Sequence, residues 1–164
     1  ISLFLLGCTA VKQQSNIESC PQVLFLKDYR NYITTDENLL TYENISYRAE
    51  INNYNFDKEC QISNNTLNGR LSILFVINPD KAKKSNITIP YFVAILDNQK
   101  NIKDLQYYSV SGYLDKNLDT SLYNETEIID TRKISIPYKD EVTGIENKIL
   151  IGFMIDKEKL KILN

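Results

Sequence analysis

Residues 67–78 read Leu-Asn-Gly-Arg-Leu-Ser-Ile-Leu-Phe-Val-Ile-Asn, and this stretch decides the fold. From residue 71, large apolar side chains recur at every second position, which is the period of a β-strand with one buried face. The side chains that we expect to point inward are Leu71, Ile73, Phe75 and Ile77. The run stops at Asn78-Pro79-Asp80, a turn signal. We therefore predict a long strand here, with other strands arranged around it.

Short apolar or alternating runs lie on both sides of this strand. They cover residues 22–26, 45–51, 59–62, 89–97, 104–114, 128–138 and 148–155. Clusters of Asn, Asp, Lys and Pro separate the runs at the spacing of sandwiches and barrels. We predict an all-β fold, an antiparallel immunoglobulin- or fibronectin-like β-sandwich of seven or eight strands, with a small β-barrel as the alternative.

Three details refine this expectation. Residues 148–155 are apolar on both faces, which predicts a strand in the middle of a sheet. Pro90 stands near the start of the run 89–97, where a missing backbone donor does least harm. Asp156 precedes Lys-Glu-Lys-Leu and is expected to be the N-cap of a short C-terminal helical turn.

The chain opens with the apolar run Ile1-Ser2-Leu3-Phe4-Leu5-Leu6, which ends in Gly7-Cys8. Leu5-Leu6-Gly7-Cys8 resembles the lipobox of bacterial lipoprotein signal peptides. The resemblance implies cleavage before Cys8 and a diacylglyceryl group on its thiol, and two or three acyl chains anchor a protein stably. A bilayer span needs about 20 apolar residues, so this run is too short for one. The alternative is that Ile1 to Leu6 form a first core strand.

A domain organisation follows from the lipobox. We expect residues 1–7 to be a signal-peptide remnant, residues 8–19 a lipidated N-terminus with a flexible tether, and residues 20–164 the folded domain. The domain would face the periplasm from either the inner or the outer bacterial membrane.

A broader resemblance covers most of residues 20–160. Cys20-Pro21-Gln22-Val23, a cysteine at position 60, the strand 89–97 and Ile149-Leu150-Ile151-Gly152-Phe153 follow in an order that resembles a group of alphaproteobacterial envelope lipoproteins of unknown function. The resemblance implies a lipid-anchored domain. It transfers no catalytic residue.

Composition argues against several classes of function. The chain has no His, which excludes Ser-His-Asp and Cys-His catalysis, and its five Gly form no phosphate-binding motif. A net charge of −2 without a basic stripe argues against a nucleic-acid partner. The cluster Lys81-Ala82-Lys83-Lys84 is expected to cap a hairpin loop rather than to bind phosphate or a membrane surface. We expect no enzyme and no cofactor.

Two cysteines remain once Cys8 carries lipid. Cys20 and Cys60 form an even pair, which in an oxidising envelope is most simply a structural disulfide. A redox-active pair is the alternative, although no Cys-x-x-Cys spacing supports it. Zinc would need more thiols or a His. Asp115-Lys116-Asn117-Leu118-Asp119 opens like a calcium loop but lacks its Gly and Glu, so we expect no metal site.

The eleven tyrosines are the remaining unusual feature. Tyr29, Tyr32, Tyr42 and Tyr54, together with Tyr47, crowd the first half of the chain, where exposed rings would suit contact with a protein or a glycan. The alternative, which we favour, is ordinary strand packing of the rings. We expect a non-enzymatic protein-binding or assembly-accessory module, with a small-ligand or carbohydrate-binding domain as the second hypothesis and a thiol-redox protein as the third.

Overall fold

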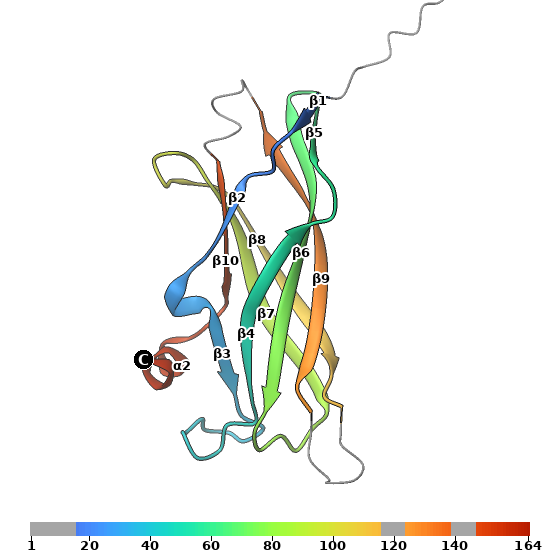
Figure 1. Cartoon of the computed structure of the whole chain (residues 1–164). Coiled ribbons are helices and arrows are strands. Elements are labelled where there is room, and N and C mark those ends of the chain that lie inside the picture. The colour runs from blue at the N-terminus through green and yellow to red at the C-terminus, as the bar shows by residue number, and fades with distance from the viewer. Residues whose placement is uncertain (1–15, 116–123, 139–146) are drawn as a thin grey trace, which may run out of the picture.

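The computed structural model describes residues 16–115, 124–138 and 147–164, and this part of the chain is built almost wholly of strands (Figure 1). The strands are β1 (Asn16–Glu18), β2 (Gln22–Phe25), β3 (Asn31–Thr34), β4 (Tyr47–Phe56), β5 (Cys60–Ser63), β6 (Thr66–Pro79), β7 (Asn86–Leu96), β8 (Ile102–Tyr113), β9 (Thr126–Pro137) and β10 (Lys148–Phe153). A 3-10 turn η1 (Lys27–Tyr29) and a helix α2 (Lys157–Leu163) complete the described elements.

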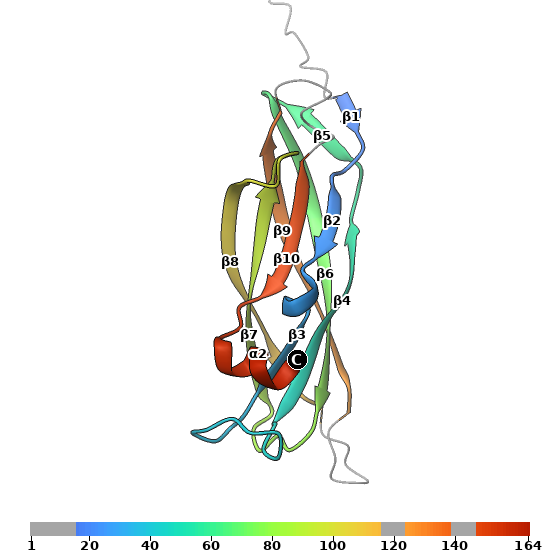
Figure 2. The same cartoon turned by 90° about the vertical axis from the view of Figure 1, so that its left-hand side faces the viewer.

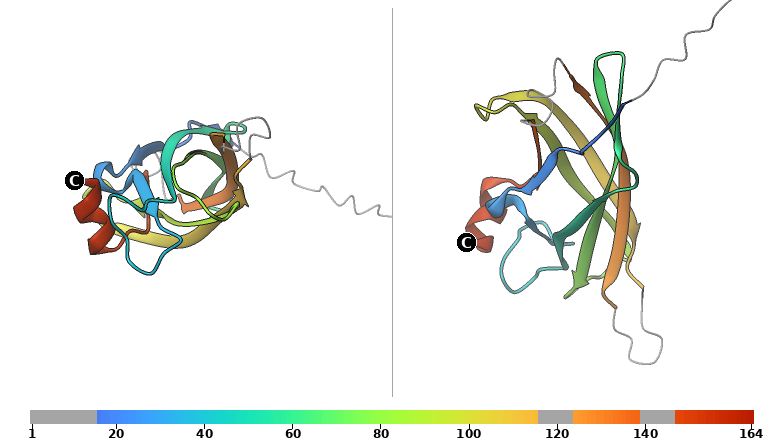
Figure 3. Two further views of the ribbon diagram at one scale, coloured as in Figure 1. Left: turned by 90° about the horizontal axis from the view of Figure 1, so that it is seen from below. Right: turned by 45° about the horizontal axis from the view of Figure 1, so that its top comes forward.

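The strands form two sheets that face each other (Figure 3). In the first sheet the order is β1-β5-β6-β4-β3, and β9 pairs with the other side of β6. In the second sheet the order is β2-β10-β7-β8. The sheets do not close into a barrel, so the predicted all-β sandwich is confirmed and the barrel alternative is not adopted.

The stretch that decides the fold is the centre of the first sheet. Residues 67–78 lie within β6, which pairs with β4, β5 and β9. The side chains at 71, 73, 75 and 77 are fully buried, as the alternation predicts. The ring of Phe75 lies 5.0 Å from that of Tyr91 and 5.8 Å from that of Phe153, centroid to centroid. The inner face of β6 therefore packs directly on the second sheet.

The four central strands connect as in an immunoglobulin domain. β6 pairs with β9 in one sheet and β7 pairs with β10 in the other, which is the arrangement of strands B with E and C with F. β8 pairs with β7 in the position of the extra strand of variable domains. The expected antiparallel pattern has one exception, because β2 runs parallel to β10.

Several local predictions can be compared with the structure. β10 lies between β2 and β7, as its apolar pattern predicts, and the carboxylate of Asp156 accepts a 2.8 Å hydrogen bond from the Lys159 N–H at the start of α2. β7 begins at Asn86, earlier than predicted, so Pro90 lies inside the strand. The Pro90 carbonyl accepts from the Met154 N–H at 2.9 Å, one residue beyond the last pair with β10. Proline has no backbone N–H, and the position where that N–H is missing thus falls at the end of the hydrogen-bonded ladder between β7 and β10.

The pattern did not predict β1 or β3. β1 comes from the segment expected to be a tether, and its residue Glu18 pairs with Cys60 of β5. β3 contains the polar residues Asn31 and Thr34, and it forms because β4 offers it a partner on one side while α2 packs against it (Figure 1). Both strands depend on tertiary pairing, which local alternation does not reveal.

Candidate binding surface

The outward faces of the two sheets differ in chemistry. On the first sheet, the outward positions of β6 and β9 carry mainly polar groups that bond to one another. The hydroxyl of Ser72 lies 2.8 Å from that of Thr131, and the hydroxyl of Ser135 donates to Asn68 at 2.9 Å. Leu74, Val76 and Ile129 are the apolar exceptions there. This face has the polarity expected of a solvated sheet.

The outward face of the second sheet carries an apolar band between polar positions such as Gln22, Lys148 and Thr88. Leu24 of β2, Leu150 of β10, Ala94 of β7 and Leu105 of β8 are register partners, so they form one row across all four strands. In the next row Phe92 of β7 stands opposite Tyr107 of β8. None of these six side chains belongs to the core between the sheets. We call these six residues the apolar face.

Neighbouring side chains pack closely on the apolar face. Ala94 is only 1% exposed although it points away from the inter-sheet core. The ring of Tyr29, from η1, lies 6.5 Å from that of Phe92 in an edge-on arrangement. Gly152 lies beneath them, since a Cβ on it would come within 2.7 Å of Phe92 and 3.0 Å of the Tyr29 Cβ. Of the six residues, Tyr107 is largely exposed, Leu24, Phe92, Leu105 and Leu150 are half-buried and Ala94 is buried. A contiguous apolar surface outside the core is a feature of interaction sites.

The apolar face ends at β8, the border strand of the second sheet (Figure 2). Tyr107 and Tyr113 of this strand are 62% and 70% exposed, and both lie on the outward side. Sequence analysis did not single out either residue. The alternation of the strand could have found them: Tyr107 and Tyr113 stand at odd-numbered positions, whereas the inward residues Tyr108 and Val110 stand at even-numbered ones.

A polar cluster lies between the sheets at the flank beside β8. The Tyr91 hydroxyl donates to the Asp130 carboxylate at 2.6 Å, and the Arg132 guanidinium binds the same carboxylate oxygen at 2.7 Å. Arg132 also lies over the ring of Tyr108, 4.4 Å from its centroid. Burial, and then the hydrogen bond to Asp130, raise the pKa of the Tyr91 hydroxyl well above its ordinary value. Tyr91 therefore stays protonated, and each of the three polar side chains bonds to the other two.

The four tyrosines proposed for partner contact do not form one patch. Tyr32 is a correction, because it is 5% exposed and its ring packs 5.5 Å from that of Phe153. Tyr54 is half-buried and contacts Phe25 and Phe56 edge-on. Tyr29 packs on the apolar face, whereas Tyr42 is 66% exposed on the loop between β3 and β4. Of the four, Tyr29 alone lies beside the apolar face.

Cys20 and Cys60 are bonded to each other, as predicted, with Cα atoms 5.1 Å apart. The bond ties the segment between β1 and β2 to the start of β5. Cys60 is buried, which limits access by an exchanging thiol. Cys8 lies outside the described residues, and so do residues 116–119 of the sequence that resembles a calcium loop.

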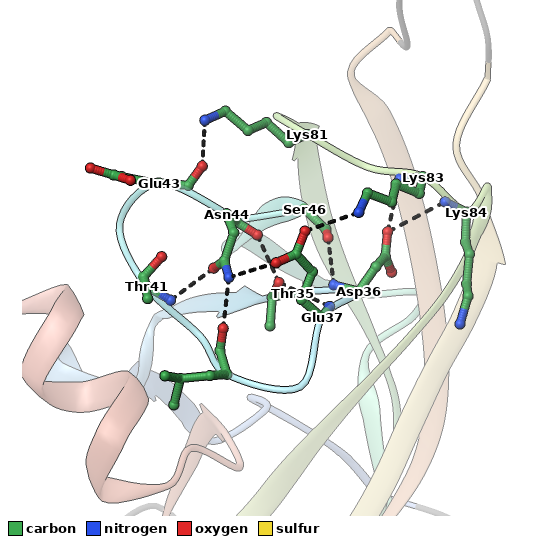
Figure 4. Close-up of polar contacts among 11 residues, drawn as sticks. Thr35, Asp36, Glu37, Thr41, Glu43, Asn44, Ser46, Lys81, Lys83 and Lys84 are labelled. Carbon is green, nitrogen blue, oxygen red and sulfur yellow. Dashed lines mark hydrogen bonds and ion pairs between the residues drawn. The ribbon is translucent and has the colours of Figure 1, made fainter.

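The Lys81–Lys84 segment does not cap a hairpin. β6 and β7 belong to different sheets, so the segment crosses between them. The backbone N–H of Lys83 donates to the Asp36 carboxylate at 2.8 Å, and its ammonium binds Glu37 at 2.9 Å (Figure 4). Lys81 donates to the carbonyl of Glu43. The lysines therefore hold this crossover against the β3–β4 loop.

The β3–β4 loop is itself held by side-chain bonds. The Asn44 side chain accepts from the Thr41 N–H at 2.8 Å and donates to the Leu39 carbonyl at 2.6 Å, and the Ser46 hydroxyl accepts from the Asp36 N–H at 2.7 Å (Figure 4). Partial burial acts to raise the pKa of Asp36, but the N–H donors of Lys83 and Lys84 and the Ser46 hydroxyl outweigh it and hold that pKa below its ordinary value. These hydrogen bonds account for the conformation of the β3–β4 loop, and no ligand is needed to hold it.

Shallow hollows on the described surface include two that are lined mainly by polar residues. One is part of the β3–β4 loop, between Asp36 and Asn44. The other lies on the first sheet beside Asp57, Glu59, Arg70 and Lys133, where Arg70 and Asp57 form an ion pair of 3.4 Å. Asp140 and Glu141 lie outside the described residues. Across residues 16–115, 124–138 and 147–164, no three acidic or thiol side chains gather as a metal site would require.

No helix in the described ranges is long and apolar enough to cross a bilayer. Comparison with known proteins found no matching family model, curated protein or solved structure.

Proposed function

We propose that this chain is a non-enzymatic protein-binding or assembly-accessory module of a bacterial envelope. Acylated Cys8 would anchor it to the inner or outer membrane, and the domain would face the periplasm. The apolar face of the second sheet would contact an envelope protein. No cofactor and no nucleic acid has a part in this proposal.

The apolar face is the observation that carries the proposal. Leu24, Leu150, Ala94 and Leu105 form an unbroken row, while the outward positions of β6 and β9 on the first sheet are mainly polar. Covering an outward sheet face removes apolar area from water at about 25 cal/mol per Å², which favours association. Aromatic side chains such as Phe92 and Tyr107 are typical anchors of protein interfaces.

Membrane anchoring would complement this surface. A lipid at Cys8 confines the domain to one membrane and raises its effective concentration for a neighbour in the same layer. A modest apolar interface is then sufficient. Catalysis adds nothing to this mechanism.

The other two hypotheses have less support. In the first-sheet hollow Asp57 is engaged by Arg70 and Ser72, and in the other hollow Asn44 is engaged by its own loop, so these groups serve the protein's own structure. A redox role would need thiols in exchange with solvent, whereas Cys60 is buried in its disulfide. The protein-binding hypothesis is therefore the one we pursue.

The test compares two variants in cells that make the protein. Leu150→Lys puts a charge in the middle of the apolar face, and Ile129→Lys makes the same kind of change on the outer face of the first sheet. After chemical crosslinking, we expect Leu150→Lys to reduce recovery of specific partners by about tenfold or more, as loss of an interface hot spot does. We expect Ile129→Lys to leave recovery unchanged. Equal recovery from both variants would refute the proposal.

A further inference from the structure

The border strands of the described sheets are protected to different degrees. β9 carries Glu127, Asp130, Arg132 and Lys133 and ends at Pro137, all of which discourage strand addition. β3 has α2 packed against it, and β2 is only four residues long. β8 is a border strand of twelve residues, and from Leu105 to Tyr113 it contains no charged residue and no proline. It is thus the one border among these four without the usual safeguards.

The backbone groups of β8 that point away from β7 can be identified. The Leu114 N–H donates to the Ser85 carbonyl, so the even-numbered residues of β8 face β7 and the odd-numbered ones face outward. The outward N–H of Leu105 is already bonded to the Asp104 carboxylate at 2.9 Å. The open stretch therefore presents the N–H and carbonyl groups of Tyr107, Ser109, Ser111 and Tyr113.

These four residues are arranged symmetrically in the sequence about Val110, with a serine one position and a tyrosine three positions away on each side. The edge can therefore pair with a copy of itself. An antiparallel copy of β8, related by a two-fold axis at Val110, would place Ser109 opposite Ser111 and Tyr107 opposite Tyr113. Each such pair exchanges two backbone hydrogen bonds. Every open donor and acceptor of the stretch then finds a partner, and no like charges meet.

The side chains fit the same arrangement on both faces. On the outward face, the two most exposed tyrosines of the strand, Tyr107 and Tyr113, would form cross-strand aromatic pairs, which stabilise sheets. On the inward face, Tyr108 would stand opposite Gly112, where Ile128 of β9 already fills the place of a side chain. Val110 would meet its own copy at the centre.

We propose that β8 is a dimerisation edge that pairs in antiparallel fashion with β8 of a second copy of this chain, centred on Val110. The second sheets of the two copies then form one continuous eight-stranded sheet. The two apolar faces become a single surface, on which an envelope partner would contact both copies. The dimer itself does not depend on the proposed function, because it needs no partner.

The test uses charge pairs at the two serines. In the variant Ser109→Lys/Ser111→Lys, the new lysines of one copy face those of the other, whereas in Ser109→Lys/Ser111→Glu each lysine faces a glutamate. We expect sedimentation equilibrium of the full chain, with its Cys8 thiol alkylated, to show a dimer for the natural sequence and for the Lys/Glu variant. We expect a monomer for the Lys/Lys variant.

Ser109→Pro supplies a second variant that removes an outward donor without touching the ladder to β7. It deletes two hydrogen bonds per dimer and should weaken dimerisation by about 30-fold or more, while Ser109→Ala should leave it unchanged. The amides of Tyr107, Ser109, Ser111 and Tyr113 should exchange with deuterium more slowly as protein concentration rises.

Three results would overturn the proposal. One is a natural chain that remains monomeric up to about 1 mM. Another is equal dimerisation of the Lys/Lys and Lys/Glu variants. The third is protection of these amides only when a different protein is added, which would assign the edge to a heterologous strand. None of these results bears on recovery of partners by Leu150→Lys, so the dimer and the proposed function can fail separately.

Discussion

The hydroxyl of Tyr91, on β7, donates a 2.6 Å hydrogen bond to the carboxylate of Asp130, on β9, and so links the two sheets. Arg132 completes the cluster and covers Tyr108. Inward-pointing charges on a border strand are a recognised protection against strand addition. The link explains how β9 is protected while β8, next to it in the other sheet, keeps an open edge.

Removing the Tyr91 hydroxyl should therefore destabilise the domain without unfolding it. Tyr91→Phe leaves the ring in the core but takes a donor from a charged acceptor, a loss of about 1–2 kcal/mol in the free energy of unfolding. Urea unfolding followed by circular dichroism measures it. The matched control is Tyr113→Phe, an exposed hydroxyl, for which we expect a change below about 0.5 kcal/mol. Equal effects of the two variants would contradict the role given to the cluster.

The disulfide between Cys20 and Cys60 should contribute more to the free energy of unfolding than the Tyr91 hydroxyl does. It closes a loop with a sequence separation of 40, which corresponds to about 4 kcal/mol in the chain-entropy model. We expect the double variant Cys20→Ser/Cys60→Ser to lose stability of this order in thermal or urea unfolding. Cys8→Ser is the control and should leave the free energy of unfolding of the domain unchanged. A loss shared by Cys8→Ser would assign the effect to something other than this loop.

Asp97 makes stability depend on pH at the acidic end. Some loss of hydration acts to raise its pKa, but hydrogen bonds from the Asn101 N–H and side chain, together with Lys103, lower the pKa to about 2. Because the pKa in the folded state lies below the ordinary value of 3.8, Asp97 contributes its full stabilisation above that value and loses it as pH falls towards about 2.

The measurement is the unfolding midpoint of the natural chain and of Asp97→Asn between about pH 6 and pH 2. The natural chain should be the more stable near neutrality, and the difference should shrink as pH falls through this range. Asp28→Asn, at an exposed carboxylate of η1, is the control. A difference that stays constant with pH would show that Asp97 acts through its shape rather than its charge.

Sequence alternation predicted the strands that bury one complete face. The inward side chains of β6 follow directly from apolar alternation, because each apolar side chain there has a local reason to point inward. β10 begins at Lys148 as predicted and ends at Phe153, two residues before the predicted end. β3 could not be found in this way, since its polar residues are held by β4 and α2. The crossover at Lys81–Lys84 was misassigned because a turn signal does not show which sheet the next strand joins.

The candidate site was present in the pattern but interpreted differently. The run 148–155 is apolar on both faces, which we took to indicate a strand in the middle of a sheet. That position is confirmed for β10, and β7 also lies inside its sheet. In a sandwich, however, one face of a central strand still looks outward, so an apolar residue there, such as Leu150 or Phe92, also signals a surface that a partner could cover. The abundance of tyrosines in the first half of the chain led us instead to consider residues such as Tyr32 for partner contact, and Tyr32 is a core residue.

Site-specific photo-crosslinking tests the central claim, contact of the apolar face with an envelope partner, most directly. A photoreactive phenylalanine analogue is placed at Leu150 in one version of the membrane-anchored protein and at Ile129 in another, and intact cells are irradiated. We predict a discrete heterologous adduct from position 150 and none from position 129. The same adducts from both positions, or none from position 150, would contradict the account.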